Sequence, residues 1–139
     1  MRYHAPPLPP PSKDFNLRDT PEFRALFDQN QSILDRHGQR HDLSWTREIE
    51  ITTRFKDRET ARNARAYVLD AYPEAEGVLF RVQSFKYSED DTTIQLAFSI
   101  EAIPDAEIIT TYEFMLQDAA ARFGGDTPGW EMSATPSKA

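Results

Sequence analysis

The sequence predicts an α+β sandwich in which a four-stranded antiparallel sheet carries two helices on one face and is preceded by one additional helix. Three observations predict this class. Segments with apolar residues at every second position alternate with segments whose apolar residues recur every three to four positions. Residues that cap helices stand at the ends of the second kind of segment. Two strand-like segments are separated only by the acidic turn "SEDD", which predicts a hairpin.

The length and composition are typical of one soluble domain. The chain has 139 residues, of which 39% are hydrophobic and 12% aromatic, and it contains no cysteine. Disulfides, thiolate metal sites and cysteine nucleophiles are therefore excluded. No apolar run is long enough to cross a bilayer, and the first residues lack the apolar centre of a secretory signal. We therefore expect a cytoplasmic protein that does not enter a membrane.

The ends of the chain are predicted to lie outside the folded domain. Residues 1–19 contain "APPLPPPSKD", which favours a disordered, partly polyproline arm. Residues 20–134 are predicted to form the single domain, and residues 135–139 a disordered tail.

The first helix is predicted over residues 21–37. Thr20 can cap its N-terminus, Pro21 suits the first helical position, and Gly38 is expected to end it. The helix has an apolar stripe but no place beneath the sheet. We therefore expect it to pack on a sheet edge, on the open sheet face or on a partner.

The remaining elements give the order β-α-β-β-α-β. They are a strand over 45–55, a helix between Asp57 and Pro73, strands over 77–87 and 92–101, a helix over 105–123 and a short strand over 130–134. Gly124 or Gly125 is expected to take the left-handed conformation that ends the last helix. Trp45 and Trp130 are expected to be paired core anchors. This order predicts a ferredoxin-like sandwich with strand order 4-1-3-2.

No candidate catalytic or metal-binding group is supported by its context. His37 and His41, with Asp42, are separated by a predicted helix end and have no further convergent ligand. Glu48 and Glu50 share one strand face about 7 Å apart, but no pocket surrounds them to shift a pKa and exclude water. The glycines of "RFGGD" follow a helix, whereas a phosphate-binding loop opens one. We therefore predict no enzyme activity, no metal and no cofactor.

Charge is distributed unevenly along the chain, whose net charge is −7. Residues 1–86 carry 14 basic and 13 acidic side chains, whereas residues 87–139 carry 2 basic and 10 acidic ones. Nucleic-acid binding needs a basic stripe to neutralise phosphates, so direct binding is not expected from the second half. Two interpretations remain open: the acidic excess meets a basic protein partner, or it only maintains solubility.

Three segments resemble a known family. They are the helix end "LDRHG", the segment "FKDRETARNARAYV", and the long segment "EAIPDAEIITTYEFMLQDAAARFGGDTPGWE". Together they resemble the regulator of ribonuclease activity B (RraB) family, the inhibitors of ribonuclease E, over residues 25–134. The final glycines and "GWE" resemble the terminal Asp-Gly-Trp motif of that family.

The resemblance implies a non-catalytic inhibitor or regulator of a nuclease in RNA processing or decay, acting by protein-protein contact. The alternative function is an immunity protein that neutralises a cognate bacterial toxin. For either function we expect a basic protein partner, and the sequence does not define the oligomeric state. The expected partner-binding residues are acidic: Glu48, Glu50, Glu89, Asp90, Asp91, Glu101 and Glu131.

Overall fold

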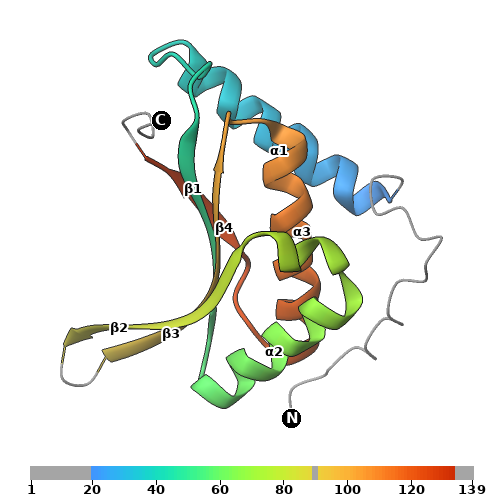
Figure 1. Cartoon of the computed structure of the whole chain (residues 1–139), viewed down its shortest axis with the longest axis vertical. Helices are drawn as coiled ribbons and strands as arrows, with labels where there is room; N and C mark the ends of the chain where they lie inside the picture. The colour runs from blue at the N-terminus through green and yellow to red at the C-terminus, as the bar shows by residue number, and fades with distance from the viewer. Residues whose placement is uncertain (1–19, 89–90, 134–139) are drawn as a thin grey trace.

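The computed structural model describes residues 20–88 and 91–133, which form one sheet and three α-helices (Figure 1). The elements in chain order are α1 (Pro21–Gly38), β1 (Arg47–Phe55), α2 (Arg58–Ala71), η2 (Pro73–Gly77), β2 (Leu79–Ser88), β3 (Asp91–Ala102), α3 (Ala106–Phe123) and β4 (Gly129–Met132). The α+β class and the number of strands are confirmed. The short 3-10 helix η2, which follows Pro73, was not predicted.

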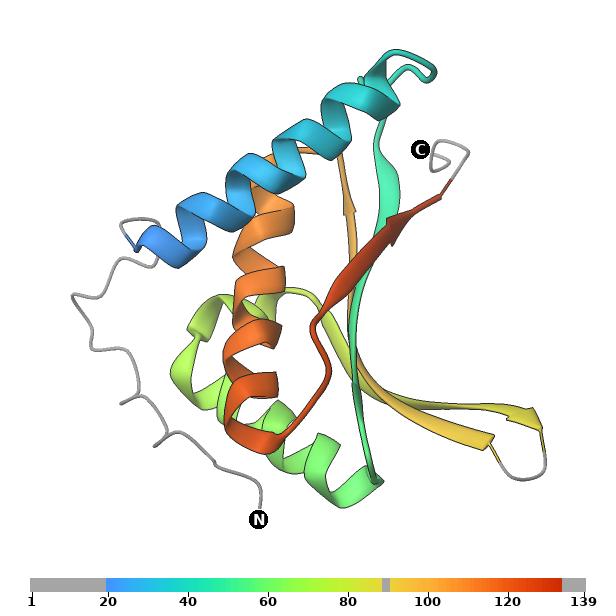
Figure 2. The same ribbon diagram turned by 180° about the vertical axis from the view of Figure 1, so that it is seen from behind.

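The sheet has the strand order β2-β3-β1-β4, which reads 4-1-3-2 when it is counted from the β4 edge. All three neighbouring pairs are antiparallel. Helices α2 and α3 cover one face of the sheet, and no helix of residues 20–88 and 91–133 covers the other face (Figures 1 and 2).

The core lies between the sheet and the two helices. Every second residue of β1 is buried, as the alternating pattern predicted, and the corresponding residues of β3 are buried too. The aromatic rings of Phe80 and Phe98 stack at a centroid distance of 4.0 Å, and Tyr112 meets Phe98 edge-on. Small residues on α2, Ala61 and Ala64, let this helix approach the sheet closely.

Helix α1 packs on α3 and crosses its outer side (Figure 2). Phe23 and Leu34 are buried in this contact, and the ring of Phe23 meets that of Phe114 at 5.9 Å. None of the three expected positions describes this packing, because the helix layer itself provides the docking surface. As a result α3 is covered by the sheet, by α2 and by α1.

A buried polar cluster fixes the position of α1. Asn30 is 2% exposed, and its side-chain amide donates to Thr110 Oγ1 at 3.0 Å and to Glu113 Oε1 at 3.2 Å. The indole Nε1 of Trp130 donates to Asn30 Oδ1 at 2.9 Å. Burial raises the pKa of Glu113, which Asn30 partly opposes by its hydrogen bond. One side chain of α1 therefore connects α3 with the edge strand β4.

The two consecutive glycines after α3 have different roles. Gly124 adopts φ 76°, so the predicted left-handed end of the helix is confirmed. At Gly125 an added Cβ would lie 2.7 Å from the ring of Phe55 and 3.1 Å from the carbonyl oxygen of Arg54. The first glycine therefore permits the turn, and the second permits the close approach of this turn to β1. From there the chain enters β4.

One local prediction is wrong. Trp45 is not a core anchor: it precedes β1 and is 57% exposed, whereas Arg47 takes the buried position. Gly38 is the last residue of α1, as predicted, and Gln39 caps the helix in a right-handed conformation. Buried residues occur on several sides of α3, Ile109 among them, because this helix is covered on several sides.

Candidate partner-binding face

The uncovered sheet face brings four of the predicted acidic residues together. Glu48 of β1 lies directly opposite Glu101 of β3, and Glu50 of β1 lies directly opposite Glu131 of β4. Since residues opposite each other project from the same side of a sheet, all four carboxylates belong to one face. We call these residues, Glu48, Glu50, Glu101 and Glu131, the glutamate quartet.

The arrangement of the quartet is unfavourable for the isolated protein. Like charges directly opposite on neighbouring strands destabilise a sheet, whereas opposite charges at such positions contribute about 0.2–1 kcal/mol. Two such pairs occur side by side on a face that needs no charged residue for packing. A cost of this kind is typical of surfaces that are kept for binding.

Polar side chains of β2 lie beside the quartet. Arg81 approaches Glu50 at 3.6 Å between Nη2 and Oε2, and Gln83 donates to Glu50 Oε1 at 3.4 Å. Gln83 also donates to Gln95, which is buried. Glu50 is therefore partly compensated, whereas Glu48, Glu101 and Glu131 are exposed carboxylates.

An exposed tryptophan stands at the quartet's end of the sheet. Trp45 precedes β1 at the position where Arg47 faces Ala102 of β3. Its indole Nε1 donates to Asp42 Oδ2 at 3.0 Å, and Ser44 donates to Asp42 Oδ1 from both its backbone N–H and its hydroxyl. These hydrogen bonds, led by the Ser44 hydroxyl, lower the pKa of Asp42. The loop therefore holds an aromatic side chain in a fixed orientation in solvent.

Two more large apolar side chains are exposed near this face. Ile103 follows β3 and is 53% exposed, and Leu79 begins β2 and is 55% exposed. Leu79 aligns with Ser99, which in turn aligns with Glu50, so Leu79 shares the open face with the quartet. Exposed aromatic and aliphatic groups beside charged residues are characteristic of protein-protein interfaces. The alternation pattern could not identify Trp45 because it assigned that residue to the buried side of a longer strand.

The other predicted acidic residues cannot be placed on this face. Glu89 and Asp90 lie outside the described residues. Asp91 begins β3, but its side chain is also outside the description. The hairpin of β2 and β3 extends well beyond the helices (Figure 2).

The histidines and the aspartate considered for metal binding do not form a metal site among the described residues. The rings of His37 and His41 lie 6.4 Å apart, while the carboxylate of Asp42 is occupied by Ser44 and Trp45. Within residues 20–88 and 91–133, no group of three or more metal-ligating side chains converges. The same part of the chain contains no helix with the length and hydropathy of a membrane span.

A second polar cluster connects α2 with α3. Asp118 Oδ2 accepts hydrogen bonds from the hydroxyls of Tyr67 and Tyr72, both at 2.6 Å, and Asp118 Oδ1 accepts one from Arg122 at 2.9 Å. Burial, together with the Asp118 carboxylate, raises the pKa of both tyrosines. All these groups are engaged with one another, which indicates a structural role.

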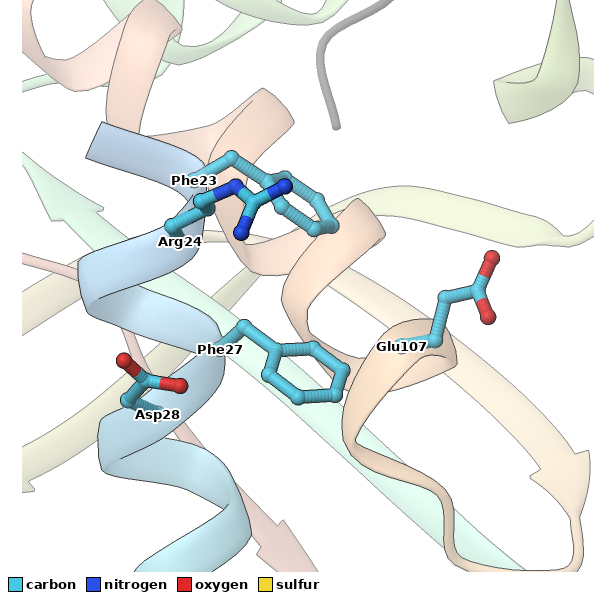
Figure 3. A pocket seen from close by; sticks show the side chains of 5 residues that line it. All are labelled: Phe23, Arg24, Phe27, Asp28 and Glu107. Atoms are coloured by element: carbon cyan, nitrogen blue, oxygen red, sulfur yellow. The ribbon is translucent and has the colours of Figure 1, made fainter. Parts of the chain in front are cut away.

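A hollow of about 330 Å³ lies between α1 and the start of α3 (Figure 3). Phe23 and Phe27 project from α1 toward α3, with Arg24 and Asp28 beside them and Glu107 on the opposite wall. Phe23 is buried against Phe114, so only part of the apolar stripe of α1 is accessible. This hollow is a weaker candidate than the open sheet face.

The fold and the open face define an α+β domain with an uncovered, acidic sheet surface and an exposed tryptophan. Comparison with protein families shows that the family described as Regulator of ribonuclease activity B matches residues 27–132, and the chain belongs to this family. The resemblance inferred from the sequence is thereby confirmed. No curated protein matches the chain.

Proposed function

We propose that this protein regulates a ribonuclease by binding it through the glutamate quartet and Trp45, without catalysing a reaction itself. The observation that supports this most strongly is the pairing of like charges on an uncovered face, Glu48 with Glu101 and Glu50 with Glu131. A basic surface on the partner would relieve both repulsions when it binds. Family membership supports a ribonuclease as the partner.

The chemistry of the proposed interface has two parts. The carboxylates accelerate association with a basic surface, an effect that weakens as salt is added. Trp45 contributes apolar area at the edge of the same region, and its hydrogen bond to Asp42 reduces the entropy that ordering costs on binding. The partner site of a nuclease for RNA is itself basic, because it must bind phosphates. An acidic protein would therefore compete with RNA for it.

The proposal extends to the setting of the protein. We propose that residues 20–134 act as one ferredoxin-like domain in the cytoplasm, and that the domain itself does not bind nucleic acid. The antiparallel pairing of all neighbouring strands and the two helices on one face support the ferredoxin-like assignment.

The test compares two charge reversals of equal size. The first variant carries Glu48→Lys, Glu101→Lys and Glu131→Lys, which spares Glu50 because it contacts Arg81 and Gln83. The control variant carries Asp70→Lys, Glu74→Lys and Glu76→Lys, which are exposed and belong to α2 and η2. Tagged wild-type protein first captures its nuclease from a lysate of the native organism. Association rates and RNA cleavage are then measured with the purified pair.

We expect the quartet variant to associate at least about tenfold more slowly and to lose its effect on RNA cleavage, while the control behaves as wild type. Equal rates for the two variants would show that the acidic face serves solubility only. Capture of a toxin whose gene neighbours that of this protein would favour the immunity function.

A further inference from the structure

The opposite edge of the sheet is formed by β2, which pairs with β3 on one side only. Among the described strands, none lies on its other side. An unpaired edge of this kind presents backbone N–H and C=O groups that can pair with a further strand. The edge spans ten residues, Leu79–Ser88, and lies far from β4.

The hydrogen bonds of the neighbouring strands determine which groups face outward. Ser133 N–H donates to the carbonyl of Glu48, and Asp126 N–H donates to that of Arg54, so the even-numbered residues of β1 point their backbone groups away from β3. In an antiparallel ladder these directions alternate from residue to residue. Given the registers of β1 on β3 and of β3 on β2, the outward groups of β2 therefore belong to its even-numbered residues.

A side-chain contact agrees with this assignment. Arg65 of α2 donates from Nε to the carbonyl oxygen of Phe80 at 2.9 Å, from the free side of β2. The next outward groups along the edge belong to Val82 and Ser84, which follow the same register without interruption. These two residues offer N–H and C=O groups about 7 Å apart, the spacing at which an added strand makes its hydrogen bonds.

Cationic side chains flank this free edge. Arg58 Nη2 donates to Ser84 Oγ at 3.0 Å. Arg65, seven residues after Arg58 on α2, donates to the carbonyl oxygen of Phe80. Arg62 lies between them at helical spacing, which places it on the same side of α2, and it is exposed. On the open face of the sheet, Arg81 projects from β2 itself. Three guanidinium groups therefore lie on one side of the edge and one on the other.

We propose that the free edge of β2 binds an extended, acidic segment of a partner protein as a fifth strand. Its backbone would pair with Val82 and Ser84, and its carboxylates would meet Arg58 and Arg62. Charge complementarity selects this occupant. A second copy of this chain would bring the same cations face to face, and nucleic acid has no amide backbone to continue the ladder. The proposal rests on the β2 edge and is independent of the glutamate quartet.

The experiment uses a nine-residue synthetic peptide in which valine alternates with glutamate, added to the isotope-labelled full chain. We expect shifts of the Val82 and Ser84 amide signals, and slower hydrogen exchange at both. A matched peptide in which every backbone nitrogen is methylated keeps the charge but has no N–H group and cannot continue the ladder. A third peptide, alternating valine with lysine, keeps the ladder and reverses the charge. We expect neither to bind at this edge.

Two protein variants locate the contacts. Ser84→Pro removes one outward N–H at an edge position, where proline is tolerated. This change should lower the affinity for the valine-glutamate peptide by about tenfold. Arg62→Glu should lower this affinity by about fivefold, whereas Arg24→Glu, the same charge reversal on α1, should leave the affinity unchanged. Dispersed amide spectra confirm that each variant is folded.

Four results would overturn the proposal. They are the absence of binding up to millimolar peptide, equal binding of the backbone-methylated peptide, equal binding of the valine-lysine peptide, and binding whose signal changes lie away from β2. Oligouridylate serves as a further probe. If it shifts the Val82 and Ser84 amide signals in the same way, the β2 edge is a nucleic-acid surface instead. Because the quartet is unaltered in all these proteins, failure here would leave the proposed regulation of a nuclease intact.

Discussion

Replacement of Asn30 by leucine should destabilise the domain far more than a change at the adjacent exposed position. Asn30 is the only residue of α1 whose side chain bonds to both α3 and β4 among the described contacts. Leucine has a similar size but can neither accept from Trp130 nor donate to Glu113. The variant therefore leaves three polar groups, on Thr110, Glu113 and Trp130, without this partner while the volume is nearly kept.

The magnitude follows from the burial of these three groups. A buried polar group without its partner costs about 1–3 kcal/mol. Glu113 is 4% exposed, but Trp130 is only partly buried, so we expect a total loss of about 2–4 kcal/mol. Domains of this size have unfolding free energies of about 5–15 kcal/mol. With a urea dependence of about 1–3 kcal/mol per molar, the midpoint should fall by about 1–3 M.

Urea unfolding followed by circular dichroism measures this loss. The control is Gln31→Ala, which removes an exposed hydrogen bond to Asp35 in the same helix and should cost only a few tenths of a kcal/mol. Trp130→Phe removes the donor of the hydrogen bond between Trp130 and Asn30. The double variant should therefore show a coupling free energy of about 0.5–3 kcal/mol. A midpoint for Asn30→Leu equal to that of Gln31→Ala, or additive single effects, would refute the reasoning.

The remaining predictions concern the site, the closing turn and pH. Glu101→Gln with Glu131→Gln should raise thermal stability, by about 0.2–1 kcal/mol for each relieved pair, with a larger effect at low salt. Equal melting temperatures in both salts would contradict this. Gly125→Ala should cost about 1–3 kcal/mol because its Cβ meets Phe55. Gly129→Ala, with open space around it, should cost nothing in the same urea titration. Because burial raises the pKa of Glu113, the folded state retains its proton to higher pH than the unfolded state. Stability should therefore fall as pH rises from about 4.5 through the raised pKa, and Glu113→Gln should remove that fall. Parallel urea midpoints of the two proteins across pH would rule this out.

The fold class, the family and the main element boundaries could be predicted from the sequence because they depend on local signals. Thr20, Asp57 and Asp105 each cap a helix N-terminus by accepting a hydrogen bond from a backbone N–H a few residues later, whatever else surrounds them. Alternation of side chains in β1 and β3 likewise follows from the strand itself, so the buried positions Ile49, Ile51, Leu96 and Phe98 agree with the pattern.

The tertiary structure alone decided where α1 packs, which tryptophan is exposed and which charges meet. The periodicity of α1 shows that it has an apolar side but not what that side contacts, and the partners of Asn30 lie 80 to 100 residues away in sequence. Trp45 and Trp130 are equally apolar. The loop fixed by Asp42 holds the first in solvent, and the contact with Asn30 holds the second against the core. Sequence likewise gave Glu48, Glu50, Glu101 and Glu131 as acidic positions on strands. Only the pairing register places them opposite one another, because a register joins strands that are distant along the chain.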